Sequence, residues 1–150
     1  MESAILLVED DAADAALVRR AVKKLTFNAR VVHVNDAEAA VSYLEGQSPY
    51  DNRSEYPVPL VILLDIKLPG LSGFELIEWL RRQAAPLKRI AVVMLTSSGH
   101  QVDVNRAYEV GANSYLRKPD KHSELIELLA SFNDFWLTRS ELPDALEGLS

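Results

Sequence analysis

The chain has 150 residues, of which 48% are hydrophobic, and its formal net charge is -6. This size fits one domain with a substantial core. Cysteine is absent, which excludes disulfides and thiolate metal sites. Lysine and arginine are scattered rather than grouped, so no nucleic-acid-binding surface is expected. No apolar run is long enough to cross a bilayer, and the first residues do not resemble a signal peptide. We therefore expect a cytoplasmic protein without a membrane partner.

The first part of the chain alternates short apolar runs with amphipathic segments. Residues 4–8 form a fully apolar run typical of a buried strand, and residues 11–24 have the apolar period of a helix. Residues 29–34 are expected to form a second strand. Residues 36–45 are expected to form a second helix, which Gly46 is placed to end.

The middle of the chain begins with a long polar loop over residues 47–58. Residues 60–64 are continuously apolar, as in strands that are buried on both faces of a parallel sheet. Ser72 and Glu75 have the spacing of a capping box, which predicts the start of a helix. Pro86 is expected to close that helix.

The last part of the chain continues the same alternation. We expect a strand at residues 90–95, a helix at 101–110 that stops at Gly111, a short strand at 114–116 and a helix at 123–137. Five strands and five helices in strict alternation predict an α/β fold in which helices cover both faces of a parallel sheet. The flavodoxin-like strand order 2-1-3-4-5 is one common solution.

Polar side chains follow four of the predicted strands. Glu9 and Asp10 follow the first strand, Asp65 the third, Thr96 the fourth and Lys118 the fifth. In an open α/β sheet, ligands bind beyond the carboxyl ends of the strands. We therefore expect these side chains to converge on one functional rim.

The chemistry of this rim favours a divalent cation and a phosphoryl group. Three carboxylates held close together repel one another unless a cation joins them, and Mg²⁺ prefers oxygen ligands. Asp10 and Asp65 are the expected direct ligands, and Glu9 is expected to act through a water. Asp65 would then act as the nucleophile toward phosphorus. Lys118 and Thr96 would neutralise the transferring oxygens.

These residues resemble the receiver domain of two-component response regulators, the CheY-like family, and the resemblance covers most of the chain. The matching motifs are Leu7-Val8-Glu9-Asp10-Asp11, Leu64-Asp65-Ile66-Lys67-Leu68-Pro69-Gly70 followed by Gly73, Leu95-Thr96-Ser97, and Tyr115-Leu116-Arg117-Lys118-Pro119. The resemblance implies a receiver domain over residues 1–138. It also implies a histidine kinase as partner and Mg²⁺ as cofactor, for which Mn²⁺ could substitute. The chain would assist its own phosphorylation and its own dephosphorylation, which would be slow. It would not act as an enzyme on other molecules.

The resemblance also implies roles for individual residues. Lys67 would give its backbone carbonyl to Mg²⁺, and the peptide bond between Lys118 and Pro119 would be cis. Thr96 and Tyr115 would be the switch residues, of which Tyr115 turns inward after phosphorylation. A separate hypothesis rests on predicted placement: Lys67 and Ser98 flank the path of the attacking water and are expected to tune the hydrolysis rate of the acyl phosphate.

A narrower resemblance concerns the loop 47–58 and the ending Phe135-Trp136-Leu137, which look like those of single-domain regulators paired with phytochrome-type histidine kinases. The alternative is that Phe135 and Trp136 only complete the core face of the last helix. The tail, residues 139–150, is expected to add a homodimer contact. Output is expected through protein–protein contacts or a further phosphotransfer protein.

Three other functions would place different demands on these residues. A haloacid-dehalogenase-type phosphatase needs a second aspartate two positions after its nucleophile, where this chain has Lys67. A flavodoxin-like flavin carrier needs a phosphate loop rich in Gly, Ser and Thr, where this chain has residues 9–11, all acidic. A receiver-shaped scaffold that works without phosphorylation stays open as the alternative.

Overall fold

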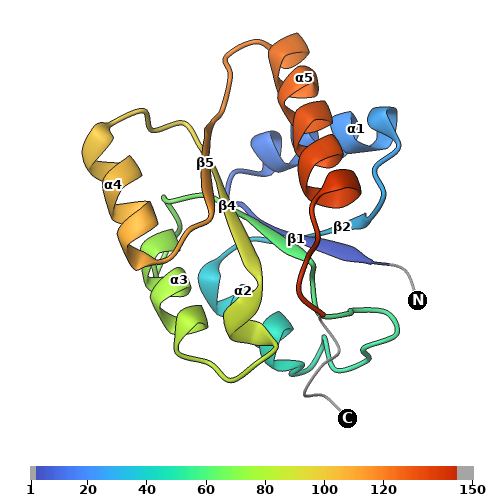
Figure 1. Ribbon diagram of the computed structural model, residues 1–150, viewed down its shortest axis with the longest axis vertical. Coiled ribbons are helices and arrows are strands. Elements are labelled where there is room, and N and C mark those ends of the chain that lie inside the picture. The colour runs from blue at the N-terminus through green and yellow to red at the C-terminus, as the bar shows by residue number, and fades with distance from the viewer. Residues whose placement is uncertain (1–2, 145–150) are drawn as a thin grey trace.

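The structure is a computed structural model that describes residues 3–144. Within this range the chain forms one parallel sheet in the order β2-β1-β3-β4-β5 (Figure 1), so the predicted fold is confirmed. The strands are β1 (Ala4–Val8), β2 (Arg30–Val34), β3 (Val61–Leu64), β4 (Ala91–Thr96) and β5 (Ser114–Arg117). The runs in β1, β3 and β4 are buried throughout. This explains why they lack polar alternation.

A helix follows each strand along the chain. The helices are α1 (Ala12–Leu25), α2 (Ala37–Glu45), α3 (Gly73–Arg81), α4 (Gln101–Val110) and α5 (His122–Phe132). Aspartate side chains cap the first two helices, because Asp11 accepts from two backbone N–H groups and Asp36 from one. The predicted capping box of Ser72 and Glu75 is present at the start of α3.

Two predicted helix ends are wrong. The helix α3 ends at Arg81 rather than near Pro86, because the backbone N–H groups of the next two residues bond to carbonyls three residues back and tighten the chain into a turn. A short 3₁₀ helix, η1 (Leu87–Arg89), then leads into β4. The last helix changes after Phe132 into a π-helical segment, η2 (Asn133–Arg139).

The sheet separates two apolar layers. The helices α1 and α5 cover one face, and α2, α3 and α4 cover the other (Figure 1). Fully buried side chains such as Ile5 and Leu129 fill the first layer, and Leu6, Ile77 and Met94 fill the second. Since both faces are covered, only the rims of the sheet are free for chemistry.

The loop 47–58 is packed against α2. Arg53 donates to the backbone carbonyls of Tyr43 and Leu44 at the end of that helix, at 2.8 and 2.7 Å. The rings of Tyr50 and Tyr56 pack against the ring of Tyr43 in tilted and edge-to-face arrangements. The loop is therefore an ordered structural addition to the sheet.

The end of the chain lies partly on the domain itself. Trp136 is half-buried and packs beside the layer of α1 and α5, as does Leu142, whereas Phe135 is 57% exposed. Arg89 donates to the backbone carbonyl of Asp144 at 3.2 Å. Trp136 thus completes the core and Phe135 does not. The rest of the predicted dimer tail, residues 145–150, lies outside the described residues. In the described part of the chain, no helix is both long enough and apolar enough to cross a membrane.

Candidate functional site

The predicted rim residues come together at the carboxyl ends of the strands. Glu9 and Asp10 follow β1, Asp65 follows β3, Thr96 ends β4 and Lys118 follows β5. Oxygen atoms of the three acidic residues lie within 4.8 Å of one another. Glu9, Asp65 and Thr96 are buried, whereas Asp10 is exposed. The cluster therefore opens to solvent on one side, as a site that exchanges a small ligand must.

The nucleophile candidate, Asp65, is held by tight backbone packing. Its N–H donates to the carbonyl of Val8 at 3.1 Å, and Gly73 donates to the carbonyl of Ile66 at 3.0 Å. A Cβ atom on Gly73 would lie 2.3 Å from the backbone oxygen of Asp65. Only glycine allows so close an approach. This explains why the predicted motif has glycine at position 73.

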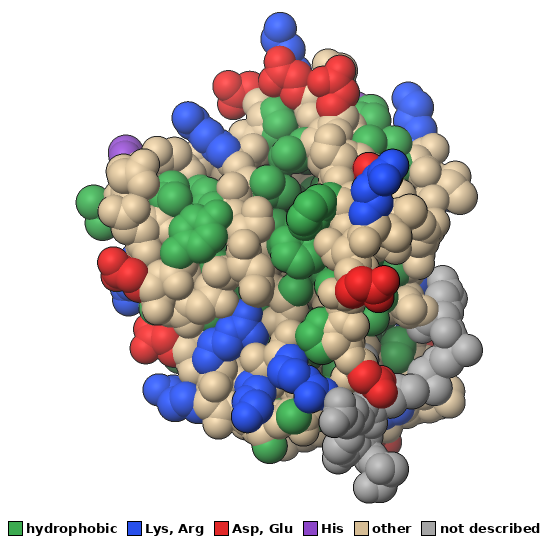
Figure 2. All heavy atoms as spheres, viewed as in Figure 1, with side chains coloured by type: hydrophobic (Ala, Val, Ile, Leu, Met, Phe, Trp, Pro, Cys, Tyr) green, Lys and Arg blue, Asp and Glu red, His purple; other side chains and the backbone are tan. Residues whose placement is uncertain are grey.

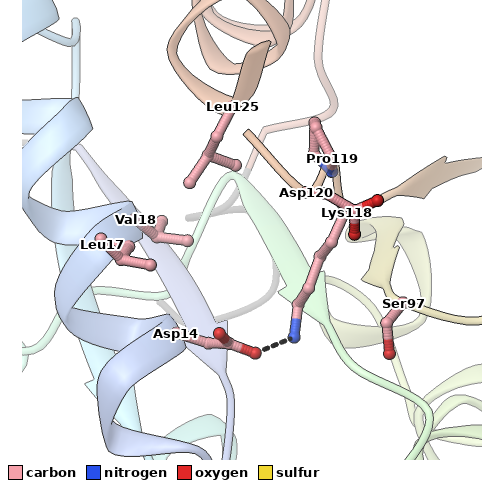
Figure 3. Close-up of a pocket in the computed structure, with 8 residues that line it drawn as sticks. All are labelled: Asp14, Leu17, Val18, Ser97, Lys118, Pro119, Asp120 and Leu125. Atoms are coloured by element: carbon pink, nitrogen blue, oxygen red, sulfur yellow. Dashed lines mark hydrogen bonds and ion pairs between the residues drawn. The ribbon is translucent and has the colours of Figure 1, made fainter. Parts of the chain in front are cut away.

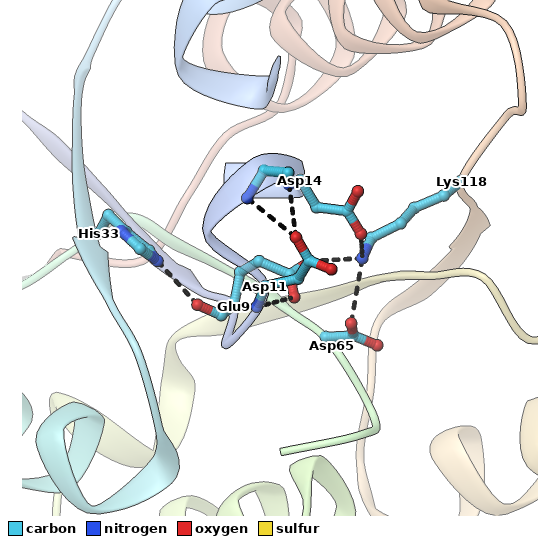
Figure 4. Close-up of polar contacts among 7 residues, drawn as sticks. Glu9, Asp11, Asp14, His33, Asp65 and Lys118 are labelled. Atoms are coloured by element: carbon cyan, nitrogen blue, oxygen red, sulfur yellow. Dashed lines mark hydrogen bonds and ion pairs between the residues drawn. The ribbon is translucent and has the colours of Figure 1, made fainter. Parts of the chain in front are cut away.

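Lys118 connects three acidic residues from different parts of the chain (Figure 4). Its Nζ donates to Asp65 Oδ2 at 3.0 Å, to Asp14 Oδ2 at 3.0 Å and to Glu9 Oε1. The contact to Asp14 was not predicted. Asp14 lies in the first turn of α1, which begins after Asp10, and no local pattern in the sequence marks it as a partner of Lys118.

The electrostatics of the cluster is unbalanced. Burial raises the pKa of Glu9 to about 7, although the hydrogen bond and the charge of Lys118 oppose the rise. Burial alone would lower the pKa of Lys118, but its hydrogen bond with Glu9 and the charge of Asp65 raise it above its ordinary value. One ammonium thus faces several carboxylates. Hard oxygen ligands with an excess of negative charge fit a divalent cation.

The predicted switch residues, Thr96 and Tyr115, are each hydrogen-bonded to another segment of the chain. The hydroxyl of Tyr115 donates to the backbone carbonyl of Ser98 at 2.8 Å, and its ring packs against the layer of α2, α3 and α4. The hydroxyl of Ser98 donates to Asp103 at 2.6 Å. The backbone N–H of Lys118 donates to the carbonyl of Thr96 at 2.7 Å. The loop after β4 is therefore tied to β5 through Tyr115, and the end of β4 is bonded to the residue that follows β5.

A polar hollow of about 380 Å³ lies beside the acidic cluster. It brings the two predicted rate-tuning residues together, because both Lys67 and Ser98 line it. Lys67 is exposed, two positions after Asp65. The Ser98 hydroxyl is engaged by Asp103 rather than free.

The predicted cis bond before Pro119 is wrong. Within the described residues, the cis peptide bonds are Ser48–Pro49 and Ala85–Pro86. His33 was not predicted at the site, yet its Nε2 lies 2.7 Å from the backbone oxygen of Glu9. No local pattern in the sequence predicts this contact, because the two residues lie at the ends of neighbouring strands that are far apart in the sequence.

Known proteins resemble this chain over nearly its whole length. The response regulator Rcp1 of Synechocystis sp. is 38% identical over 141 residues, which are 94% of this chain and 93% of that protein. The crystal structure of the Mn²⁺-bound form of Rcp1 matches with a TM-score of 0.83 at 37% identity, over 95% of this chain and 99% of the other. The crystal structure of the phosphorylated cyanobacterial phytochrome response regulator RcpA matches with a TM-score of 0.86 at 33% identity, over 96% and 100%.

The family model of the response regulator receiver domain matches residues 5–130. This match includes all of the sheet except the first residue of β1, and all the acidic and basic side chains of the rim described above. The resemblance that the motifs predicted is therefore confirmed, and the chain belongs to the response regulator receiver domain family.

Proposed function

We propose that the chain accepts a phosphoryl group on Asp65 from a histidine kinase, in a reaction that depends on Mg²⁺. One observation supports this most strongly. The buried Asp65 carboxylate lies 3.0 Å from the Lys118 ammonium and within 4.8 Å of Glu9 and Asp10. A nucleophile, a cation for phosphoryl oxygens and a set of metal ligands thus share one rim.

Each residue has a defined part in this reaction. Asp10, Asp65 and the backbone carbonyl of Lys67 would hold the metal directly, and Glu9 through a water. Bound Mg²⁺ supplies charge neutralisation at one phosphoryl oxygen. Lys118 neutralises a second oxygen, and the Thr96 hydroxyl or a neighbouring backbone N–H group the third. The Mn²⁺-bound Rcp1 structure and the phosphorylated RcpA structure support this reading by similarity.

The transfer balances without a further reactant. A bond forms between an oxygen of Asp65 and the phosphorus, and the bond from phosphorus to the imidazole nitrogen of the donor breaks. The electron pair stays on that nitrogen, and imidazole is a good leaving group. The chain acts here as an acceptor rather than an enzyme on other substrates.

Lys67 and Ser98, which line the adjoining hollow, would set how fast water removes the phosphoryl group. Unchanged hydrolysis rates in Lys67→Ala and Ser98→Ala would contradict that part.

The proposal includes a partner and an output. The partner is a sensor histidine kinase of the phytochrome type, because RcpA is a phytochrome response regulator. Thr96 and Tyr115 would convert phosphorylation into a new shape of the face formed by α4, β5 and α5. Figure 2 shows hydrophobic side chains gathered along this face, and Val102 and Tyr108 are among the exposed ones. Such a surface fits protein–protein contacts.

A homodimer would use the same side of the molecule. An apolar hollow lies between β5 and α5, lined by Leu116, Leu128 and Trp136 beside the exposed Phe135. Light scattering on wild type and Phe135→Ser tests this part. A mass of one chain at every concentration of wild type would contradict it.

Intact-protein mass spectrometry after incubation with acetyl phosphate tests the main proposal. We expect one phosphoryl adduct on wild type that requires Mg²⁺ and is absent from Asp65→Asn. The control is Asp120→Asn, which removes an exposed carboxylate two positions after Lys118 and is expected to keep the adduct. No adduct on wild type, with a cognate kinase as donor as well, would favour the phosphorylation-independent scaffold.

A further inference from the structure

Asp14 is the member of the Lys118 network that the proposed reaction leaves without a role. Its Oδ2 lies 3.0 Å from Lys118 Nζ, the same distance as Asp65 Oδ2. An ammonium has three N–H donors, and Glu9, Asp14 and Asp65 occupy all three. Asp14 and Asp65 therefore contact the same ammonium group.

The position of Asp14 differs from that of the other two partners. It lies in the first turn of α1, where its N–H bonds to the side chain of Asp11 at 3.0 Å. Its side chain is 41% exposed, against 3% for Glu9 and 10% for Asp65. Figure 3 shows it pointing toward the Lys118 ammonium, and both residues line a hollow of about 260 Å³. The contact thus ties α1 to the end of β5.

The three carboxylates are also not equivalent chemically. Glu9 and Asp65 belong to the acidic cluster that fits a divalent cation, together with Asp10, whereas Asp14 is outside it. A cation held by that cluster competes with the ammonium for Glu9 and Asp65. A lysine side chain is a flexible stem with a freely rotating head, so it needs a fixed partner to stay in place. Asp14 lies outside the cluster, so a cation bound there would leave this partner to Lys118.

We propose that Asp14 is a positioning residue, which keeps the Lys118 ammonium beside Asp65 when the acidic cluster binds a cation and when Asp65 receives the phosphoryl group. The consequence for phosphorylation rests on the proposed function. The anchoring of Lys118 itself does not. Asp14 acts only through Lys118, and the tests below depend on this point.

The first test is a double-mutant cycle on the rate of phosphorylation by acetyl phosphate at saturating Mg²⁺. Asp14→Ala is expected to slow the reaction about two- to fivefold, the usual size of an ion pair between partly exposed side chains. Asp14→Glu, which keeps the charge, is expected to restore most of the rate. In a Lys118→Ala background, Asp14→Ala is expected to have no further effect. The control Asp120→Ala removes the same charge from the same hollow and is expected to keep the wild-type rate.

An equal loss of rate in both backgrounds would overturn the proposal, because Asp14 would then act without Lys118. No loss in the wild-type background would overturn it as well. If the wild type itself takes no phosphoryl group, the proposed function fails, and a second measurement decides the anchoring. The ¹⁵N signal of the Lys118 ammonium is expected to show faster proton exchange with solvent in Asp14→Ala than in wild type or Asp120→Ala, with Mg²⁺ present. Identical exchange in all three proteins would refute the anchoring.

Discussion

The raised pKa of Glu9 predicts that cation binding releases a proton. Burial holds this pKa at about 7, against an ordinary value of 4.5. At about pH 6, below this pKa, most of the Glu9 side chains carry a proton. A cation bound at the cluster favours the ionised carboxylate, so binding is expected to release protons at that pH. The apparent affinity for Mg²⁺ should rise with pH and level off above about 7.

Calorimetric titration in two buffers of different ionisation enthalpy measures the released protons. Glu9→Gln keeps the shape of the side chain but does not titrate, so the proton release near pH 6 is expected to disappear. Glu45→Gln, an exposed residue at the end of α2, is the matched control and is expected to retain it. The same release in Glu9→Gln as in wild type would refute this assignment of the proton.

The raised pKa of Glu9 also predicts how the stability of the fold depends on pH when no cation is bound. Because the folded pKa is above the unfolded one, the folded chain binds more protons between about pH 4.5 and 7. The free energy of unfolding is therefore expected to fall as the pH rises through this window, and to fall less in Glu9→Gln. Urea titrations at several pH values measure it, and a wild-type stability that rises across the window would contradict the direction.

Three predictions concern the scaffold, each measured by denaturant unfolding. Arg81→Ala should cost about 2–4 kcal/mol, because its guanidinium donates to the carbonyls of Gly111 and Ile90; a loss no larger than that of the exposed neighbour variant Arg82→Ala would contradict this. Leu129→Ala should cost about 2–5 kcal/mol, since the side chain is fully buried, and a loss below that of the partly exposed Leu128→Ala would count against it. Tyr43→Phe should cost about 1 kcal/mol, because its buried hydroxyl donates to the carbonyl of Pro57, whereas Tyr50→Phe should be neutral.

The strands and the rim could be predicted because their signals are local. A fully apolar run such as 60–64 announces a strand covered on both faces, and a charged residue directly after it, Asp65, marks the end of the strand. Parallel strands bring such ends to one rim without further information. Helix starts were equally readable, since Ser72 and Glu75 satisfy each other within one turn.

The remaining features depend on contacts between distant segments. Asp14 meets Lys118 across 104 residues, and Arg81 reaches Gly111 across 30. Neither Asp14 nor Arg81 is distinguished within its own helix, because an acidic or basic residue there is equally compatible with a solvated surface.

The measurement that tests the central claim most directly is the location of the phosphoryl group. Borohydride reduction of the protein treated with acetyl phosphate and Mg²⁺ converts an aspartyl phosphate to homoserine, and peptide mass spectrometry then identifies the position. We predict conversion at Asp65 alone among the acidic residues of the rim, with none at Asp10 or Asp14. Conversion at another aspartate, or an adduct without any converted aspartate, would contradict the account of this site.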